Sequence, residues 1–237
     1  MVKNYTLTEK NIINVKSLKE LVYDYLREQI NKHNIQPGSA INMDATAKKL
    51  GISKTPLRDA LIQLEMEGFV TIAPRRGIFV NELTLEDIEN FYQVIGALES
   101  SALANAVEKL TDSVIQKMEV LNREMQQAIE RDNFSLFYKK NLKFHNFFID
   151  LSKNDHLIRI VNNLKKRLYD FPPQKIWIKE WELSSVKEHQ EIVDFLKQGK
   201  FQEAGNYIHG VHWSSQVQHS FIMKYYFPGK SEAGKKE

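Results

Sequence analysis

The chain has 237 residues, of which 42% are hydrophobic and 27% are charged, a composition typical of a folded globular protein. It contains no cysteine, which excludes disulfides, thiolate metal sites and cysteine nucleophiles. No apolar run approaches the roughly 20 residues of a membrane-spanning helix. The opening residues MVKNYTLTEK lack the apolar region of a signal peptide. We therefore expect a soluble, cytoplasmic protein with no membrane partner.

The basic residues are distributed unevenly along the chain. Residues 1–80 hold 12 Lys and Arg against 8 Asp and Glu, whereas the remainder holds 21 against 22. The net charge of +3 therefore comes from the first third of the chain. A basic N-terminal segment beside a neutral body favours a polyanion as the partner of that segment alone.

The first third has the pattern of three helices. Apolar residues recur at helical spacing between residues 15 and 33, which predicts a helix with one buried face. Two shorter helices are predicted over residues 43–50 and 53–67, because Gly51 suits a left-handed C-terminal cap and Ser53 suits an N-cap. Two short helices separated by such a turn are typical of a helix-turn-helix motif.

A hairpin is predicted to follow the third helix. Strands are expected over residues 69–72 and 78–80, joined by the basic segment Ala-Pro-Arg-Arg-Gly. This order predicts a winged helix-turn-helix, whose second short helix enters the major groove of DNA. The alternative is a small helical domain with a few surface cations. The predicted DNA-contacting residues lie on that helix and at the hairpin tip: Ser53, Lys54, Thr55, Arg58, Arg75, Arg76 and Gly77.

The same segment carries a family resemblance. Residues 50–70, LGISKTPLRDALIQLEMEGFV, together with Pro74 and Gly77, resemble the signature of the GntR family of bacterial transcription regulators. The resemblance covers about residues 15–80. It implies that the chain binds double-stranded operator DNA as a homodimer, with a palindromic operator matching the two-fold symmetry of the protein.

The resemblance also assigns roles to single residues. It implies that Lys54, Thr55 and Arg58 lie at the DNA and that Gly77 enters the minor groove. The sequence departs from the family pattern at two positions. Lys54 stands where arginine is usual, which weakens bidentate reading of guanine. Asp44 lies near a position where some members carry a DNA-contacting arginine, and it is a poor partner for phosphate.

The C-terminal two-thirds is predicted to be an all-helical bundle. The segment TLED at residues 84–87 has capping-box form and begins a helix that ends near residue 110, and Ser185 with Glu188 gives a second capping box. The other predicted helices span residues 112–131, 133–152, 154–170, 175–181, 184–198 and 201–224. The fold class is thus mainly α. The predicted organisation is an N-terminal arm 1–14, a winged helix-turn-helix 15–80, a linker 81–84, a helical effector-binding and dimerisation domain 85–224 and a tail 225–237.

Three stretches of the bundle carry a second resemblance: Phe144-His145, Ser152-Lys153-Asn154, and Glu188-His189 followed by Gly199 and Ala204. In these stretches and in its size, the bundle resembles the ligand-binding domain of the fatty-acid-type (FCD) branch of the family. Many members of that branch hold a divalent metal with an Asp, a His four residues later, a His on a later helix and a final His 22 positions beyond it. His145 and His189 match this pattern. Asn141 stands at the Asp position, and Val211 stands at the last position with His212 next to it.

Three interpretations of these residues remain open from the sequence. The resemblance implies zinc or nickel on His145, His189 and His212, since imidazole ligands suit such metals. A shift of one residue, however, turns a helical side chain by about 100°. Alternatively, a metal-free pocket uses Asn141, His145 and His189 to hydrogen-bond a small organic acid. In the third interpretation the histidines are hydrogen-bonded core residues.

The resemblance therefore predicts a ligand-responsive transcription regulator, acting as a repressor, whose effector is a small organic acid or other metabolite in the helical bundle. Two alternatives compete with it: an enzyme with a DNA-binding appendage, and an architectural DNA-binding protein. The sequence contains no Ser, His and Asp in the order of a known catalytic triad, no phosphate-binding glycine loop and no HExxH motif. These absences argue against the first alternative, an enzyme. The second alternative, an architectural protein, gives no function to the helical bundle of about 140 residues.

Overall fold

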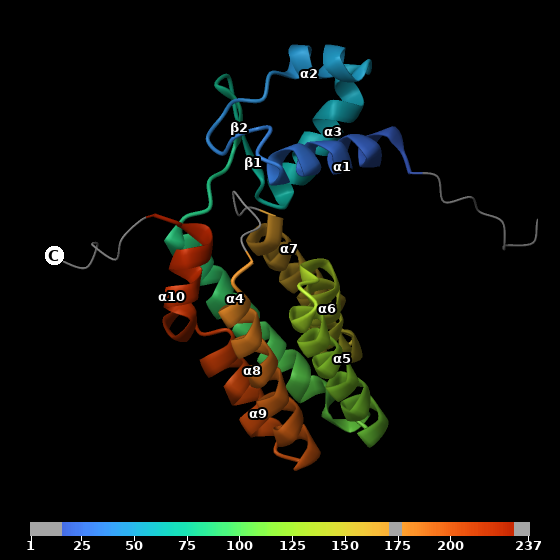
Figure 1. Cartoon of the computed structure of the whole chain (residues 1–237). Coiled ribbons are helices and arrows are strands. Elements are labelled where there is room, and N and C mark those ends of the chain that lie inside the picture. Colours follow the sequence, from blue (N-terminus) through green and yellow to red (C-terminus); the bar gives the residue numbers. More distant parts are fainter. Residues whose placement is uncertain (1–15, 171–176, 230–237) are drawn as a thin grey trace, which may run out of the picture. The chain divides into compact units, whose positions relative to one another are not determined.

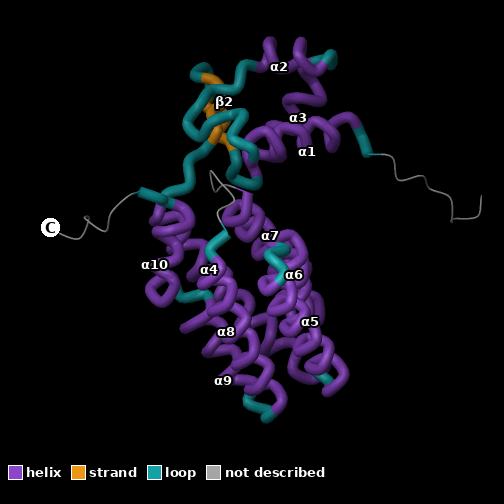
Figure 2. The backbone as a smooth tube through the Cα atoms, in the orientation of Figure 1, coloured by secondary structure: helices purple, strands orange, loops and turns teal. Residues whose placement is uncertain are grey.

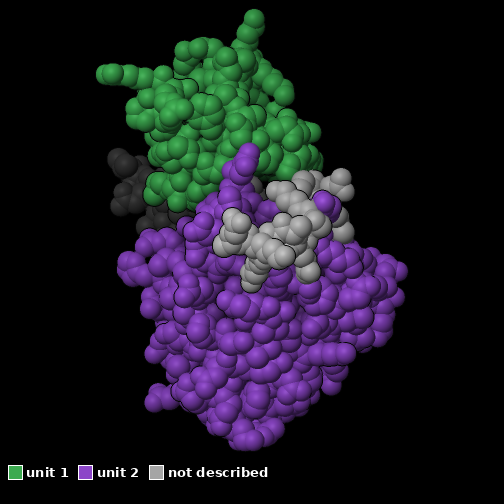
Figure 3. All heavy atoms as spheres, turned by 90° about the vertical axis from the view of Figure 1, so that its left-hand side faces the viewer, with its two compact units in different colours: residues 1–81 green, residues 82–237 purple. Residues whose placement is uncertain are grey.

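The structure is a computed structural model that describes residues 16–170 and 177–229. The chain divides into two compact units between Asn81 and Glu82 (Figure 3). The predicted N-terminal arm, residues 1–14, lies outside the described residues. In the part of the chain that is described, no helix is both long and apolar enough to cross a membrane.

The first unit is built on three helices (Figure 1). Helix α1 (Leu18–Asn31) begins at a capping box and packs against α3 (Lys54–Met66), which also contacts α2 (Met43–Leu50). Gly51 ends α2 in the left-handed conformation with φ +64°, as its sequence position predicts. Ser53 occupies the N-cap of α3, but its side chain makes no capping hydrogen bond. Fully buried residues join the helices to the hairpin: Leu26, Leu57, Leu61, Leu64 and Phe69.

The hairpin follows α3. Strands β1 (Val70–Ala73) and β2 (Gly77–Val80) pair antiparallel, with Ala73 opposite Gly77 next to the turn. The turn places Arg75 at φ +60° and Gly77 at φ +120°, and the latter is a conformation that favours glycine. Each strand differs by one residue from its predicted start. The predicted winged helix-turn-helix is confirmed.

The second unit is built of helices, as predicted (Figure 2). Its longest helix, α4 (Leu85–Ala106), begins at the predicted capping box of Thr84 and Asp87 and ends in a short 3₁₀ turn, Val107–Lys109. The following elements are α5 (Asp112–Glu130), α6 (Phe134–Leu151), α7 (Asp155–Asp170), α8 (Lys179–Lys197), α9 (Phe201–Tyr207), a π-helical turn (Ile208–His212) and α10 (Ser215–Tyr226).

Helix α4 lies at the centre of this unit. It packs against α6, α7, α9 and the π turn, while α5 packs against α6 and α8. The interior between these helices is filled by side chains with almost no exposed surface: Ile95, Leu103, Met118, Phe144, Phe148 and Ile192. The core thereby fixes α4, α6, α8 and the π turn against one another, and these elements carry the polar groups described below.

The predicted helix boundaries are wrong in two segments, residues 175–198 and residues 201–224. The segments 175–181 and 184–198 form one continuous helix, α8, from Lys179 onward, because no glycine or proline separates them; residues 171–176 lie outside the described residues. Ser185 is therefore an interior residue of α8 and not an N-cap.

The segment predicted as one helix over 201–224 contains the π turn and a new helix start at Ser214, whose side chain accepts a hydrogen bond from the backbone N–H of Val217. Helix α10 runs to Tyr226, so it takes in the first two residues of the predicted tail. Residues 230–237 of that tail lie outside the described residues.

Candidate functional site

Three buried histidines converge in the second unit. His145 comes from α6, His189 from α8 and His212 from the π turn. The Nε2 atom of His145 lies 3.2 Å from Nε2 of His189 and 3.3 Å from Nε2 of His212. One ring nitrogen from each residue lies within 4.8 Å of the others. The structure thus brings together the three histidines that the family pattern suggested as metal ligands.

The π turn explains how His212 reaches the cluster. The backbone N–H of Trp213 donates to the carbonyl of Ile208 at 2.9 Å, five residues earlier, so this turn contains one residue more than an α-helical turn. The extra residue compensates for the shift of one position between Val211 and His212. Val211 does not have to supply a ligand.

A buried carboxylate orients His145. Nδ1 of His145 lies 2.8 Å from Oε2 of Glu99, a fully buried residue of α4. Glu99 also accepts a hydrogen bond from Trp213 Nε1 at 2.9 Å and forms an ion pair with the buried Lys165. Burial alone raises the pKa of Glu99, but the charges and hydrogen bonds of His145 and Lys165 outweigh it, so the pKa lies well below its usual range. Glu99 is therefore ionised.

A second carboxylate orients His212 in the same way. Nδ1 of His212 lies 2.7 Å from Oε2 of Glu188, whose other oxygen accepts hydrogen bonds from Gln218 Nε2 at 3.0 Å and Ser184 Oγ at 3.1 Å. Carboxylates that accept from Nδ1–H leave the Nε2 lone pairs of His145 and His212 facing each other. Burial lowers the pKa of His145 to about 4, so this ring is neutral at pH 7.

This arrangement fits a divalent metal ion. Two Nε2 lone pairs 3.3 Å apart with no proton between them repel each other unless a cation or a donor lies between them. A tetrahedral zinc ion with Zn–N bonds of about 2.0–2.1 Å requires nitrogen atoms roughly 3.3 Å apart. Among the described residues, the buried Oδ1 of Asn141 has no hydrogen-bond partner and remains free to accept. The residues present thus fit a three-histidine metal site.

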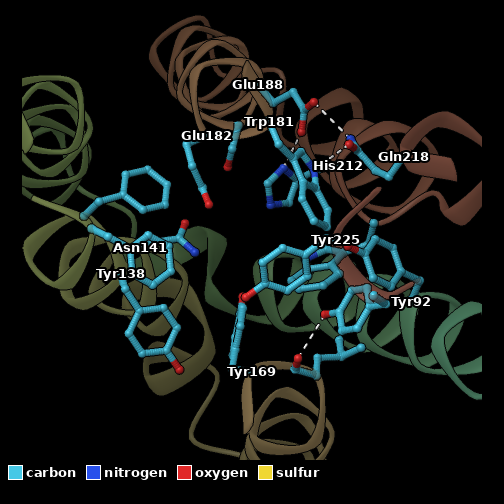
Figure 4. A pocket seen from close by; sticks show the side chains of 16 residues that line it. Tyr92, Tyr138, Asn141, Tyr169, Trp181, Glu182, Glu188, His212, Gln218 and Tyr225 are labelled. Atoms are coloured by element: carbon cyan, nitrogen blue, oxygen red, sulfur yellow. Dashed lines mark hydrogen bonds and ion pairs between the residues drawn. The ribbon is translucent and has the colours of Figure 1, made fainter. Parts of the chain in front are cut away.

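A cavity of about 80 Å³ lies next to the cluster, between α4, α6, α7, α8 and α10 (Figure 4). His212 and Asn141 are part of its wall, and the Asn141 side chain points into it. His145 and His189 are not among the described residues that line the cavity. Of the three predicted effector residues, therefore, only Asn141 faces the space that a ligand can enter.

The seven predicted DNA-contacting residues are all exposed in the first unit. On α3, Lys54, Thr55 and Arg58 are exposed, whereas Leu57 and Leu61 are buried. Arg75, Arg76 and Gly77 are at the exposed tip of the hairpin, and Ser53 is the exposed N-cap residue of α3. Lys54 forms an ion pair within the protein: its Nζ atom lies 2.5 Å from Oδ1 of Asp44 on α2.

Gly96 of α4 permits the close approach of the π turn. A Cβ atom at this position would lie 2.9 Å from Cβ of Trp213 and 3.2 Å from Cδ2 of His209. We expect Gly96→Ala to push the π turn away from α4 and to lower the free energy of unfolding by about 1–3 kcal/mol, a typical cost of overpacking. Denaturant unfolding measures this loss. Gly210→Ala is the matched control, because its Cβ would meet no atom within 4 Å. Equal stability of the two variants would contradict the close packing of α4 on the π turn.

Comparison with known proteins identifies both units. Residues 18–80 match the model of bacterial regulatory proteins of the gntR family, and residues 90–210 match the model of the FCD domain. The chain is 24% identical to YdhC, an uncharacterised HTH-type transcriptional regulator of Bacillus subtilis, over 83% of this chain and 88% of that protein. It is 29% identical to the Nta operon transcriptional regulator of Aminobacter aminovorans over 74% of this chain and 82% of that protein.

A solved structure shares the fold. The crystal structure of a GntR-type transcriptional regulator from Rhodococcus sp. RHA1 has a TM-score of 0.64 at 19% identity and covers 89% of this chain and all of that one. The matched domains and relatives are transcription regulators, in contrast to the alternative of an enzyme. The chain therefore belongs to the GntR family of bacterial transcription regulators and carries a C-terminal FCD domain.

Proposed function

We propose that the protein is a metal-dependent repressor that binds a palindromic operator as a homodimer and changes its operator affinity when a small organic acid binds in the second unit. The convergence of three histidine Nε2 atoms beside a cavity supports this proposal most strongly. The second unit, residues 85–224 in the predicted organisation, would then hold both the effector and the dimer interface.

In the first unit, α3 enters the major groove and the hairpin tip lies against the adjacent minor groove. From the exposed side of α3, Thr55 and Arg58 read the bases and Lys54 contacts a phosphate, while Ser53 and the hairpin residues Arg75, Arg76 and Gly77 contact the backbone and minor groove. Because so few reading side chains cover few base pairs, specific binding in a genome requires two copies of this unit. This requirement supports the homodimer.

In the second unit, zinc or nickel would be held by His145, His189 and His212, with Oδ1 of Asn141 as an additional neutral donor. A metal ion held there would supply a positive charge suited to a carboxylate group of the effector. Glu99 and Glu188 hold the rings of His145 and His212 in place by accepting their Nδ1–H groups. His212 and Asn141 connect this site to the cavity.

The proposal is tested on the full chain purified without a histidine tag. We expect elemental analysis to find about one zinc or nickel ion per chain, and light scattering to give the mass of two chains. Operator DNA selected from a random pool should bind with an affinity that changes when small organic acids are added, and EDTA treatment should abolish that response. A monomer with and without DNA, or a response that is unaffected by metal removal, would contradict the proposal.

Asp44 restrains Lys54 in the free protein, and its removal should strengthen DNA binding. Asp44→Asn keeps the side-chain shape but removes the negative charge that pairs with Lys54 and repels nearby phosphates. We expect the operator affinity to rise by roughly 3- to 10-fold at low salt, with a steeper salt dependence, because one more cation becomes free to contact phosphate. Fluorescence anisotropy at several salt concentrations measures both effects.

Asp24→Asn is the matched control for this experiment. It breaks a comparable exposed ion pair of α1, in which Nζ of Lys16 lies 2.6 Å from Oδ2 of Asp24. We expect no change of operator affinity from this control. If Asp44→Asn behaves like Asp24→Asn, Lys54 does not contact the DNA backbone.

A further inference from the structure

The cavity beside the histidine cluster has an unusual charge balance for an acid-binding site. Among the described residues that line it, two are glutamates and none is lysine or arginine. Glu188 accepts hydrogen bonds from His212, Gln218 and Ser184. The other carboxylate, Glu182 of α8, has no hydrogen bond or ion pair with the described residues.

Glu182 is directed into the cavity. Figure 4 shows its side chain pointing from α8 into the same space that Asn141 enters from α6. Burial raises the pKa of Glu182 to about 8, and no neighbouring cation opposes this rise. A carboxyl group in this position is costly to leave without a partner. An entering cation would supply that partner.

The walls around Glu182 are suited to a cation as well. Nine of the sixteen described lining residues are aromatic, and they include Tyr92, Tyr169, Trp181 and Tyr225. The faces of such rings attract an ammonium group, most strongly where water is excluded. Burial raises the pKa of Tyr92, Tyr169 and Tyr225, so these hydroxyl groups stay neutral at pH 7. They offer hydrogen bonds without adding a charge.

We propose that the effector carries a protonated amine, which pairs with Glu182 among the aromatic side chains, so that the effector is an amino-carboxylate. This inference rests on the proposed function, in which the carboxylate end of the effector is held at the histidine-bound metal. Glu182 and His189 are seven residues apart on α8, hence on one face of the helix and separated by roughly 10 Å along its axis. The amine and the carboxylate should therefore be joined by a short aliphatic chain.

The test uses pairs of compounds that differ only in the amine: β-alanine and propionate, γ-aminobutyrate and butyrate, δ-aminovalerate and valerate. Each is titrated calorimetrically into the zinc-loaded full chain. We expect the amino acid of at least one pair to bind about ten-fold more tightly than the matched acid without an amine. This difference is the size expected for a cation bound among aromatic rings. Titrations in two buffers of different ionisation enthalpy should show release of a proton at neutral pH, because Glu182 loses its proton when it pairs with the amine.

Glu182→Gln should remove this preference and the proton release while leaving the affinity for the plain acid unchanged. The variant should keep the Tm of the wild type at pH 7, since the carboxyl group that it replaces is largely protonated there. Glu180→Gln is the matched control on the same helix. Glu180 is exposed, and its Oε2 atom lies 3.7 Å from Nζ of Lys224. This control should retain the preference for amines.

Three outcomes overturn the inference. The first is equal or tighter binding of the plain acids by the wild type, the second is a preference for amines that survives in Glu182→Gln, and the third is binding of neither member of any pair. Metal content is measured on the same samples before the titrations. Protein that retains no zinc contradicts the proposed metal site, whereas zinc-loaded protein that binds acids without any preference contradicts only the role of Glu182.

Discussion

Arg58→Ala should strongly weaken specific operator binding while leaving the fold of the first unit intact. Arg58 is exposed on α3, one turn beyond Lys54, whereas Leu57 and Leu61 of the same helix are buried. A specific base contact is worth about 1–3 kcal/mol, and a homodimer loses two of them, so the operator affinity should fall at least about thirty-fold. Anisotropy titrations against the selected operator and a scrambled duplex, at several salt concentrations, measure this loss.

The scrambled duplex shows which kind of contact is lost. If Arg58 reads bases, the operator affinity falls toward the affinity for the scrambled duplex and the salt dependence stays the same. If it contacts phosphate, both duplexes weaken together and the salt dependence becomes shallower. Arg123→Ala, which removes an exposed arginine of α5 in the second unit, is the control and should bind as the wild type does. An unchanged operator affinity for Arg58→Ala would exclude this face of α3 from the DNA interface.

The fold of the first unit could be predicted because its determinants are local. Gly51 ends α2 in the left-handed conformation, and the apolar positions of α3 lie on one face in both the sequence pattern and the structure. The capping box of Thr84 and Asp87 was likewise readable from four residues. Such signals depend on neighbours within one or two turns, which the sequence alone supplies.

The groups that orient the histidines depend on contacts between distant segments. Glu99 of α4 reaches His145 of α6, and the two residues are 46 positions apart. A signal was nevertheless present: Glu99 shares the apolar face of α4 with Ile95, Leu103 and Ala102, all fully buried, and a charge on such a face indicates a buried partner. Which partner it has could only be read from the packing of α4 against α6 and α7.

The π turn could not be predicted from periodicity. The segment from Phe201 onward has the pattern of one helix, and the insertion of a residue becomes visible only when the turn packs against Gly96. The insertion decides whether His212 or Val211 faces the cluster, so the third histidine could be placed only by the structure. The position of Glu182 in the cavity wall was also not indicated by its sequence neighbours.

His212→Ala should remove the metal ion from the protein. Two neutral imidazoles, His145 and His189, bind a divalent ion weakly, and the third Nε2 atom completes the site. We expect the metal content to fall from about one ion per chain to near zero after desalting. In the wild type, zinc at 100 times its dissociation constant should raise the free energy of unfolding by about 2.7 kcal/mol, and this gain should disappear in the variant. Elemental analysis and thermal unfolding with and without zinc measure the two effects.

His209→Ala is the matched control, because His209 belongs to the same π turn but is exposed and lies outside the cluster. Any general disturbance of the turn should affect both variants, whereas loss of a ligand affects only His212→Ala. The control should therefore keep its metal and the full stabilisation by zinc. If His212→Ala retains the ion as tightly as His209→Ala does, the three histidines do not form the metal site, and the short Nε2 separations have to be explained by a proton shared between the rings.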